Sequence, residues 1–92
     1  MIISFKCSDT ELLAKGKRVR RFVNFECIAL RKIRQLQVFE KLEDLRVPPS
    51  NLLEALKGNR NGQYSIQIND QFRICFRWIK SGAHDVEIAD YH

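Results

Sequence analysis

The chain has 92 residues, enough for one domain spanning 1–92 and too few for two separate hydrophobic cores. Hydrophobic residues make up 45% of it and charged residues 29%, a composition typical of a folded protein rather than a disordered segment. Sixteen Lys and Arg residues against eleven Asp and Glu residues give a formal charge of +5, which favours an anionic partner. No apolar run approaches the roughly 20 residues of a membrane-spanning helix, and the N-terminus turns polar too early for a secretory signal.

The three cysteines, Cys7, Cys27 and Cys75, are an odd number without a CxxC pair, and the chain has two histidines. This pattern argues against a disulfide framework and against a zinc site. We therefore expect reduced thiols in a cytoplasmic protein that has no metal or other cofactor.

The first half of the chain predicts helices. Residues 2–7 form a candidate edge strand, and Ser8 or Asp9 could cap a helix over 10–15 that Gly16 ends. Residues 24–39 are expected to form the main helix, and a further helical turn over 41–45 is stopped by two prolines. Apolar residues follow one face of the main helix at steps of three and four: Phe22, Phe25, Ala29, Ile33 and Leu36.

The second half changes to a period of two. Residues 52–56 are short and apolar, and residues 64–68, 72–78 and 86–88 alternate between apolar and polar side chains. Tight turns at 69–70 and 81–82 join these segments, and His84 is expected in the turn after Gly82. The order predicts an α+β fold in which the helices pack on one face of a small, mainly antiparallel sheet. The other face would be free, and it carries arginines.

A dense basic run lies between the two predicted helices. Its five cations within seven positions are Lys15, Lys17, Arg18, Arg20 and Arg21. Such a run is either a solvated helix end or a surface that binds RNA through phosphate contacts.

No nucleotide-binding glycine loop, GxSxG elbow or HExxH motif is present. The side chains that remain suit work on a phosphodiester: Lys57, Arg73, Arg77, His84, Asp90, Tyr91 and His92. Cleavage of RNA by its own 2′-hydroxyl needs a proton acceptor, cations on the phosphate and a donor for the leaving 5′-oxygen.

Three strings of the sequence resemble the HigB family of toxins, the plasmid-maintenance killer proteins of the RelE-like superfamily in type II toxin–antitoxin systems. They are LEALKG at 53–58, GQYSIQINDQFRICFRW at 62–78 and DVEIADYH at 85–92. Residues 3–5 and 42–49 share the similarity, whereas the basic run and the main helix match in character alone.

The resemblance implies a RelE-like fold and a ribosome-dependent endoribonuclease that cleaves mRNA in the A site without a metal, thereby inhibiting translation. It also implies a HigA-type helix-turn-helix antitoxin, which would be the protein's sole link to operator DNA. A non-catalytic module that binds RNA or the antitoxin is the alternative.

The resemblance also implies roles for individual residues. Lys57 and Arg73 match positions that bind phosphate and stabilise transition-state charge, and the terminal Asp90, Tyr91 and His92 match the proton-transfer group. Some relatives carry a histidine where this chain has Glu54, which leaves His92 as the one imidazole placed by the family.

Simple alternation places Arg77 on the same face as Arg73, where it could contact phosphate. The alternative for Arg73 is a solvated strand residue or one that forms an ion pair with a neighbouring strand. Histidine has a pKa near neutrality, so His92 is the expected general acid, with Asp90 as orienting carboxylate or general base. Strict alternation would place Asp90 on the core side of the last strand and Tyr91 beside Arg73. We expect the chain to leave the sheet after Ala89 instead.

Overall fold

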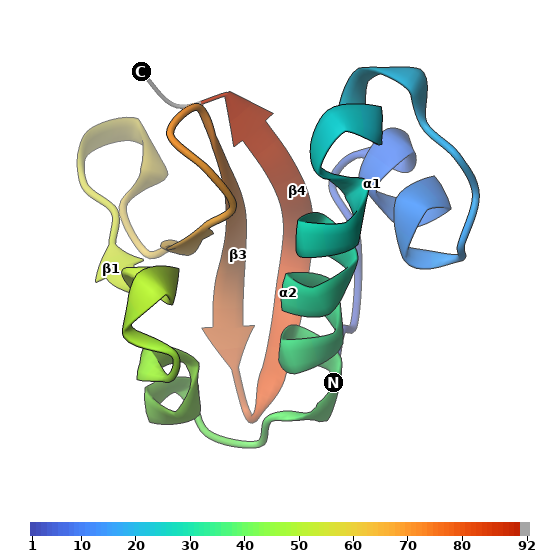
Figure 1. The fold of residues 1–92 in the computed structure, drawn as a ribbon. Helices are drawn as coiled ribbons and strands as arrows, with labels where there is room; N and C mark the ends of the chain where they lie inside the picture. Colours follow the sequence, from blue (N-terminus) through green and yellow to red (C-terminus); the bar gives the residue numbers. More distant parts are fainter. Residues whose placement is uncertain (91–92) are drawn as a thin grey trace.

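The computed structural model describes residues 1–90, which form helices on one side of a four-stranded sheet (Figure 1). The α-helices are α1 (Ser8–Ala14) and α2 (Glu26–Val38), and the strands are β1 (Glu54–Ala55), β2 (Tyr64–Gln67), β3 (Phe72–Ile79) and β4 (Gly82–Asp90). Short 3-10 helices connect them: η1 (Arg20–Phe25), η2 (Leu42–Arg46), η3 (Pro49–Asn51) and η4 (Gly58–Arg60). Within residues 1–90, none of the helices has the length and apolar character needed to cross a membrane.

All neighbouring strands pair antiparallel in the order β1-β2-β3-β4. The predicted edge strand at 2–7 is present as an extended segment that runs parallel to β4 along its free edge. The backbone N–H of Ile3 donates to the carbonyl of Ala83 at 2.8 Å, and the N–H of Val86 donates to Ser4 at 3.1 Å. The predicted mainly antiparallel α+β arrangement is confirmed.

Thr10 of α1 continues this edge where the N-terminal segment turns away. Its side chain is fully buried, and its hydroxyl accepts a hydrogen bond of 3.0 Å from the backbone N–H of Ile88. A helix side chain thereby satisfies a strand donor that would otherwise be buried without a partner.

The predicted main helix is confirmed, but it begins two residues later than expected. Phe22 and Phe25 belong to η1, and the α-helical part starts at Glu26. All five residues of the predicted apolar stripe are buried, and they share one core with Ile66, Ile74 and Phe76 of the sheet. The prediction of the buried face therefore survives the change from 3-10 to α-helical geometry, because both types return a side chain to one face every three to four residues.

Three sequence-based expectations of strand boundaries were wrong. The strand predicted over 52–56 is reduced to two residues, because Leu52 lies in the left-handed region with φ 46°. His84 belongs to β4, opposite Arg77, rather than to a turn. The chain does not leave the sheet after Ala89, because Asp90 is still paired with Phe72.

The sheet face opposite the helices is not free, which corrects a further expectation. Ser65 and Cys75 lie side by side on this face, and both are fully buried. Arg73 lies on the same face with a side chain that is 12% exposed. We call this surface the polar face of the sheet.

Candidate active site on the polar face

Arg73 is held in one orientation by three neighbours. Its Nε donates to the hydroxyl of Ser65 at 2.7 Å, and its Nη2 donates to the carbonyl of Leu52 at 2.6 Å. The carboxylate of Glu54 lies 3.8 Å from the same Nη2 and is about half exposed. A guanidinium fixed on two sides is preorganised to stabilise a negative charge brought to its remaining donors.

The pairing of the strands brings these groups together. Ser65 of β2 lies opposite both Glu54 of β1 and Cys75 of β3. Arg73 lies two residues before Cys75 in β3, opposite Gln67. Sequence alternation could place Ser65 on the polar face, because its neighbours Tyr64 and Ile66 both face the core. It could not supply the register that sets Ser65 beside Arg73, so Ser65 was missed.

Cys75 lies within this polar surface as a neutral thiol. Burial raises its pKa, and the carboxylate of Glu87 adds to the rise, while the cations Arg60 and Arg73 oppose it. An ion pair of 2.9 Å joins Arg60 to Glu87. The raised pKa makes Cys75 a structural thiol rather than a nucleophile.

Arg77 shares the polar face, as predicted, but a bulge separates it from Arg73. Cys75 pairs with Glu87 whereas Arg77 pairs with His84, so β4 carries an extra residue in this stretch. Asp85, in the bulge, has φ 55°, and its carboxylate lies 3.7 Å from Nε of Arg77.

Lys57 is an exposed residue two positions after the end of β1 and immediately before η4. The loop after it contacts Arg77, since a Cβ added at Gly62 would lie 3.0 Å from Nη1 of Arg77. Within residues 1–90, Lys57 forms no hydrogen bond or ion pair with Arg73, whose side-chain partners are Ser65, Leu52 and Glu54.

Asp90 ends the described part of β4. Its carboxylate accepts a hydrogen bond of 3.0 Å from Nε2 of Gln71. Because β4 continues to this residue, alternation puts Asp90 on the side of Val86 and Ile88, and Ala89 lies opposite Arg73. The other two predicted proton-transfer residues, Tyr91 and His92, lie outside the described residues.

The basic run does not form one uniform cationic surface. Three of its five cations are paired with acidic side chains, at N···O distances of 3.5, 3.2 and 2.9 Å for Lys15–Glu11, Arg18–Glu26 and Arg21–Asp9. Lys17 and Arg20 are exposed, and within residues 1–90 neither forms an ion pair. These two are the cations of the run that remain available to phosphate.

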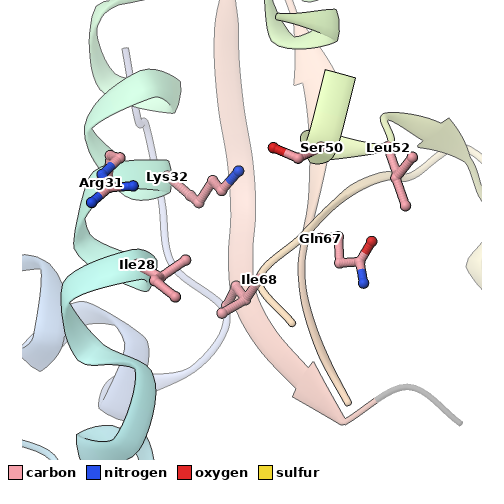
Figure 2. Close-up of a pocket in the computed structure, with 7 residues that line it drawn as sticks. All are labelled: Ile28, Arg31, Lys32, Ser50, Leu52, Gln67 and Ile68. Atoms are coloured by element: carbon pink, nitrogen blue, oxygen red, sulfur yellow. The ribbon is translucent and has the colours of Figure 1, made fainter. Parts of the chain in front are cut away.

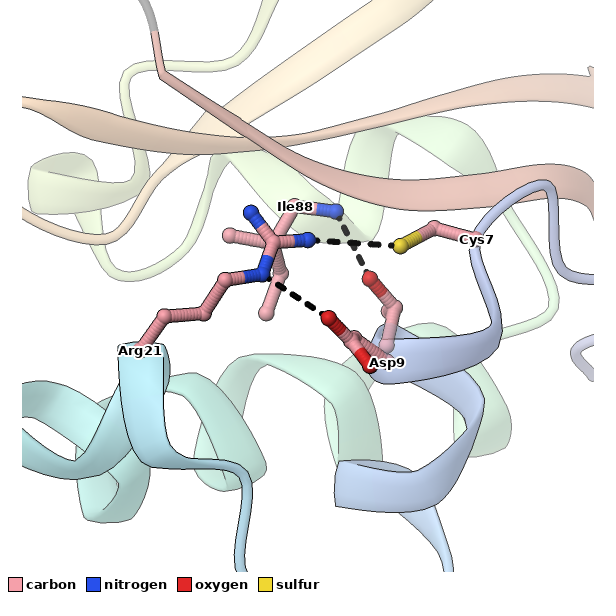
Figure 3. A network of polar contacts seen from close by, with 5 residues as sticks. Cys7, Asp9, Arg21 and Ile88 are labelled. Carbon is pink, nitrogen blue, oxygen red and sulfur yellow. Dashed lines mark hydrogen bonds and ion pairs between the residues drawn. The ribbon is translucent and has the colours of Figure 1, made fainter.

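Arg21 also belongs to a small polar network near β4 (Figure 3). Its Nη2 donates to Sγ of Cys7 at 3.5 Å, and its guanidinium carbon lies 4.4 Å from the ring centre of Phe22. Burial alone would raise the pKa of Cys7, but it is lowered because hydrogen bonds from Thr10 and Asp9, together with the Arg21 charge, outweigh burial. These contacts give Arg21 a role in joining η1 to the start of α1.

In the described part of the chain, no group of three His, Cys, Asp or Glu side chains could hold a metal ion. The polar face instead gathers a fixed guanidinium, a second arginine and several carboxylates. A fixed guanidinium of this kind can stabilise a negative charge brought to it.

Comparison with solved structures identifies the class of fold. The chain resembles a chain of a YoeB–YefM toxin–antitoxin complex from Staphylococcus aureus, with TM-score 0.58 and 20% identity over 100% of this chain and 98% of that one. For a YoeB/ParE toxin from Agrobacterium tumefaciens the TM-score is 0.59 and the identity 16%, with full coverage of both chains. For a YafQ variant from E. coli the TM-score is 0.57 and the identity 12%, over 98% of this chain and 93% of that one. The fold is that of the RelE-like toxins.

The sequence comparisons narrow this class to one family. Residues 14–92 match the family described as HigB-like toxin, the RelE-like toxin of type II toxin–antitoxin system HigB. Toxin HigB-1 of Vibrio cholerae serotype O1 is 33% identical over 81 residues, which cover 86% of this chain and 85% of that protein. The chain belongs to the HigB-like family of type II toxins.

Proposed function

We propose that this toxin is a ribosome-dependent endoribonuclease that cleaves mRNA in the ribosomal A site. In the proposed reaction the ribose 2′-oxygen attacks the adjacent phosphorus, the bond to the 5′-oxygen breaks, and the products are a 2′,3′-cyclic phosphate and a 5′-hydroxyl. No metal takes part. The observation that carries the proposal is the guanidinium of Arg73, which Ser65 and Leu52 hold on the polar face at a position the family resemblance implies.

Each residue has a distinct part in this proposal. Arg73 stabilises the negative charge that grows on the non-bridging oxygens, and Lys57 contributes a second cation. His92 gives a proton to the leaving 5′-oxygen, and Asp90 orients its ring or accepts the 2′-hydroxyl proton. Tyr91 positions the substrate.

The toxin's proposed partners are the ribosome with its mRNA, and an antitoxin of the HigA type that blocks activity in the cytoplasm. Lys17 and Arg20 support ribosome binding, because they are exposed cations without ion pairs within residues 1–90. Lys15, Arg18 and Arg21 belong to the same proposed surface, as weaker contacts that must first release a carboxylate. Arg77 contacts RNA from the polar face.

One observation favours the alternative of a non-catalytic binding module. Arg73 is bonded to the protein itself, and Glu54 lies near it where some relatives carry a histidine. In that alternative Arg73 would be a structural residue of a toxin that binds its partners without turnover.

The test is to map mRNA 5′ ends after brief expression of the wild-type toxin and of the His92→Ala variant. The proposal expects new 5′ ends within translated regions for the wild type, and a strong reduction for the variant at equal protein levels. If the wild-type toxin inhibits translation but produces no new 5′ ends, the result supports the binding module. Unchanged cleavage by the variant would remove His92 from the mechanism.

A further inference from the structure

A cavity of about 440 Å³ lies between α2 and the segment formed by η3 and the end of β2 (Figure 2). Lys32 extends from α2 into the space between these elements, with Ser50 and Gln67 on the far side and Ile68 below. Two cations, Arg31 and Lys32, line the cavity, and none of the described lining residues is acidic. The cavity reaches from α2 to the end of β2, where its lining residue Gln67 lies opposite Arg73.

Lys32 is a buried cation without a counter-charge. Lys32 is 6% exposed, and its ammonium donates a hydrogen bond to the amide oxygen of Asn51. Asn51 is a neutral partner whose amide nitrogen is already used, since it donates to Gln35 and to the carbonyl of Leu45 at 2.9 Å each. None of the ion pairs formed within residues 1–90 includes Lys32.

This arrangement is costly for the free protein. Burial lowers the pKa of Lys32, and the neighbouring charge of Arg31 lowers it further. A buried ammonium is stabilised most by a direct anionic partner. An anion in the cavity would supply the missing charge and accept an N–H that Asn51 does not use.

The walls of the cavity indicate what kind of anion fits. Ile28 and Leu52 are 38% and 56% exposed, and together with Ile68 they give the site an aliphatic lining. None of the described lining residues has the aromatic ring on which an RNA base commonly stacks. Aliphatic walls around a single buried ammonium match a carboxylate with an aliphatic neighbour, as found on an amphipathic acidic segment of a protein.

We propose that this cavity binds a glutamate or aspartate side chain, flanked by an aliphatic side chain, from an acidic segment of a protein partner. The carboxylate pairs with Lys32 and Arg31, and the aliphatic side chain packs between Ile28 and Leu52. The site lies next to the residues that hold Arg73, because the carbonyl of Leu52 accepts its hydrogen bond at 2.6 Å. A segment bound here would therefore touch Leu52, which supports Arg73 on the polar face.

The experiment is an NMR titration of the ¹⁵N-labelled full-length toxin with the capped dipeptide acetyl-Leu-Glu-amide. Acetyl-Leu-Gln-amide, inorganic phosphate and the dinucleotide UpA are titrated in parallel. We expect saturable shifts at the cavity residues with the glutamate dipeptide, and binding at least about tenfold weaker with the glutamine dipeptide, because a charge-assisted hydrogen bond is lost.

Two variants test the role of the cavity, and one serves as a matched control. Lys32→Met removes the buried charge but keeps an unbranched apolar stem, and Leu52→Asp places an anion at the rim, at a left-handed position that aspartate tolerates. Both are expected to weaken the glutamate dipeptide about tenfold or more. Arg34→Met, an exposed cation of α2 outside the cavity lining, should leave binding unchanged.

The outcomes separate this proposal from its rivals. Dispersed spectra of the variants show that they are folded, and the titration does not depend on RNA cleavage, so it stands apart from the test of the nuclease. Absence of saturable dipeptide binding, or equal binding to Lys32→Met, overturns the proposal. Phosphate or UpA binding at least as tightly as the glutamate dipeptide also overturns it, and would assign the cavity to a phosphate-bearing ligand.

Discussion

Replacing Arg73 with lysine separates the charge of this residue from its geometry. Arg73 uses Nε on the hydroxyl of Ser65 and Nη2 on the carbonyl of Leu52, at 2.7 and 2.6 Å. A lysine keeps the positive charge, but its single ammonium cannot occupy both donor positions. The Arg73→Lys variant is therefore expected to lose at least one of these two hydrogen bonds.

The size of the effect follows from the burial of the side chain. Arg73 is 12% exposed, so little water can replace a lost donor, and a hydrogen bond from a charged group contributes about 1.5–3 kcal/mol. We expect the free energy of unfolding to fall by about 1.5–3 kcal/mol. For a domain of this size that corresponds to a melting temperature lower by roughly 6–24 °C. Cleavage should fall by about 10²–10³-fold, as when a positioned donor to a developing oxyanion is removed.

Urea denaturation and single-turnover cleavage of a ribosome-bound message measure the two effects at a temperature where both proteins are folded. Arg77→Lys is the control for stability, because Arg77 lies on the same face but is 41% exposed and has an ion pair of 3.7 Å. Its free energy of unfolding should change by no more than about 0.5 kcal/mol. An Arg73→Lys variant as stable as the wild type would refute the argument from geometry. Lower stability with unchanged cleavage would make Arg73 purely structural.

Three further predictions concern other parts of the molecule. Thr10→Val, measured by urea denaturation, should lower the free energy of unfolding by about 1–3 kcal/mol because the buried N–H of Ile88 loses its acceptor; Thr10→Ser, which keeps the hydroxyl, should cost about 1 kcal/mol. The raised pKa of Cys75 means that its thiol stabilises the fold below its ordinary pKa of 9.0, so the stability of the wild type relative to Cys75→Ala should decline as pH rises above about 9; a constant difference from pH 7 to 10.5 would contradict this. Replacing Lys17 and Arg20 together with glutamine should weaken ribosome binding at low salt and flatten its salt dependence, and identical binding curves would exclude both from the interface.

Much of the core could be predicted because hydrophobic periodicity reports burial directly. The stripe from Phe22 to Leu36 is buried along its whole length, and the alternating segments at 64–68 and 72–78 became β2 and β3. The turn at 69–70 was also correct: the side chain of Asn69 accepts hydrogen bonds from the backbone N–H groups of Gln71 and Phe72, at 2.9 and 2.8 Å. Local side-chain chemistry of this kind can be recognised in one sequence.

The candidate site was harder to predict because it depends on how the strands pair. The bulge at Asp85 shifts β4 relative to β3, and nothing in the apolar pattern marks the additional residue. The bonds from Arg73 reach Ser65 and Leu52, which are 8 and 21 positions away in sequence. Lys32 was missed for a related reason, because its partner Asn51 comes from η3 on the far side of the cavity.

The ion pairs that the basic run forms with acidic residues outside it change what its composition implies. Exposed pairs of this kind contribute at most about 1 kcal/mol each to stability, so their main consequence is a weaker local positive potential. A paired arginine that binds a phosphate must first release its carboxylate. An unpaired cation replaces condensed counterions directly, and each such contact contributes about 0.7–0.9 to the slope of log affinity against log salt. Replacing Lys17 and Arg20 together should therefore reduce this slope by about 1.4–1.8. The matched variant Lys15→Gln with Arg18→Gln removes the same charge but should reduce the slope less, and an equal reduction would show that all four cations act as one surface.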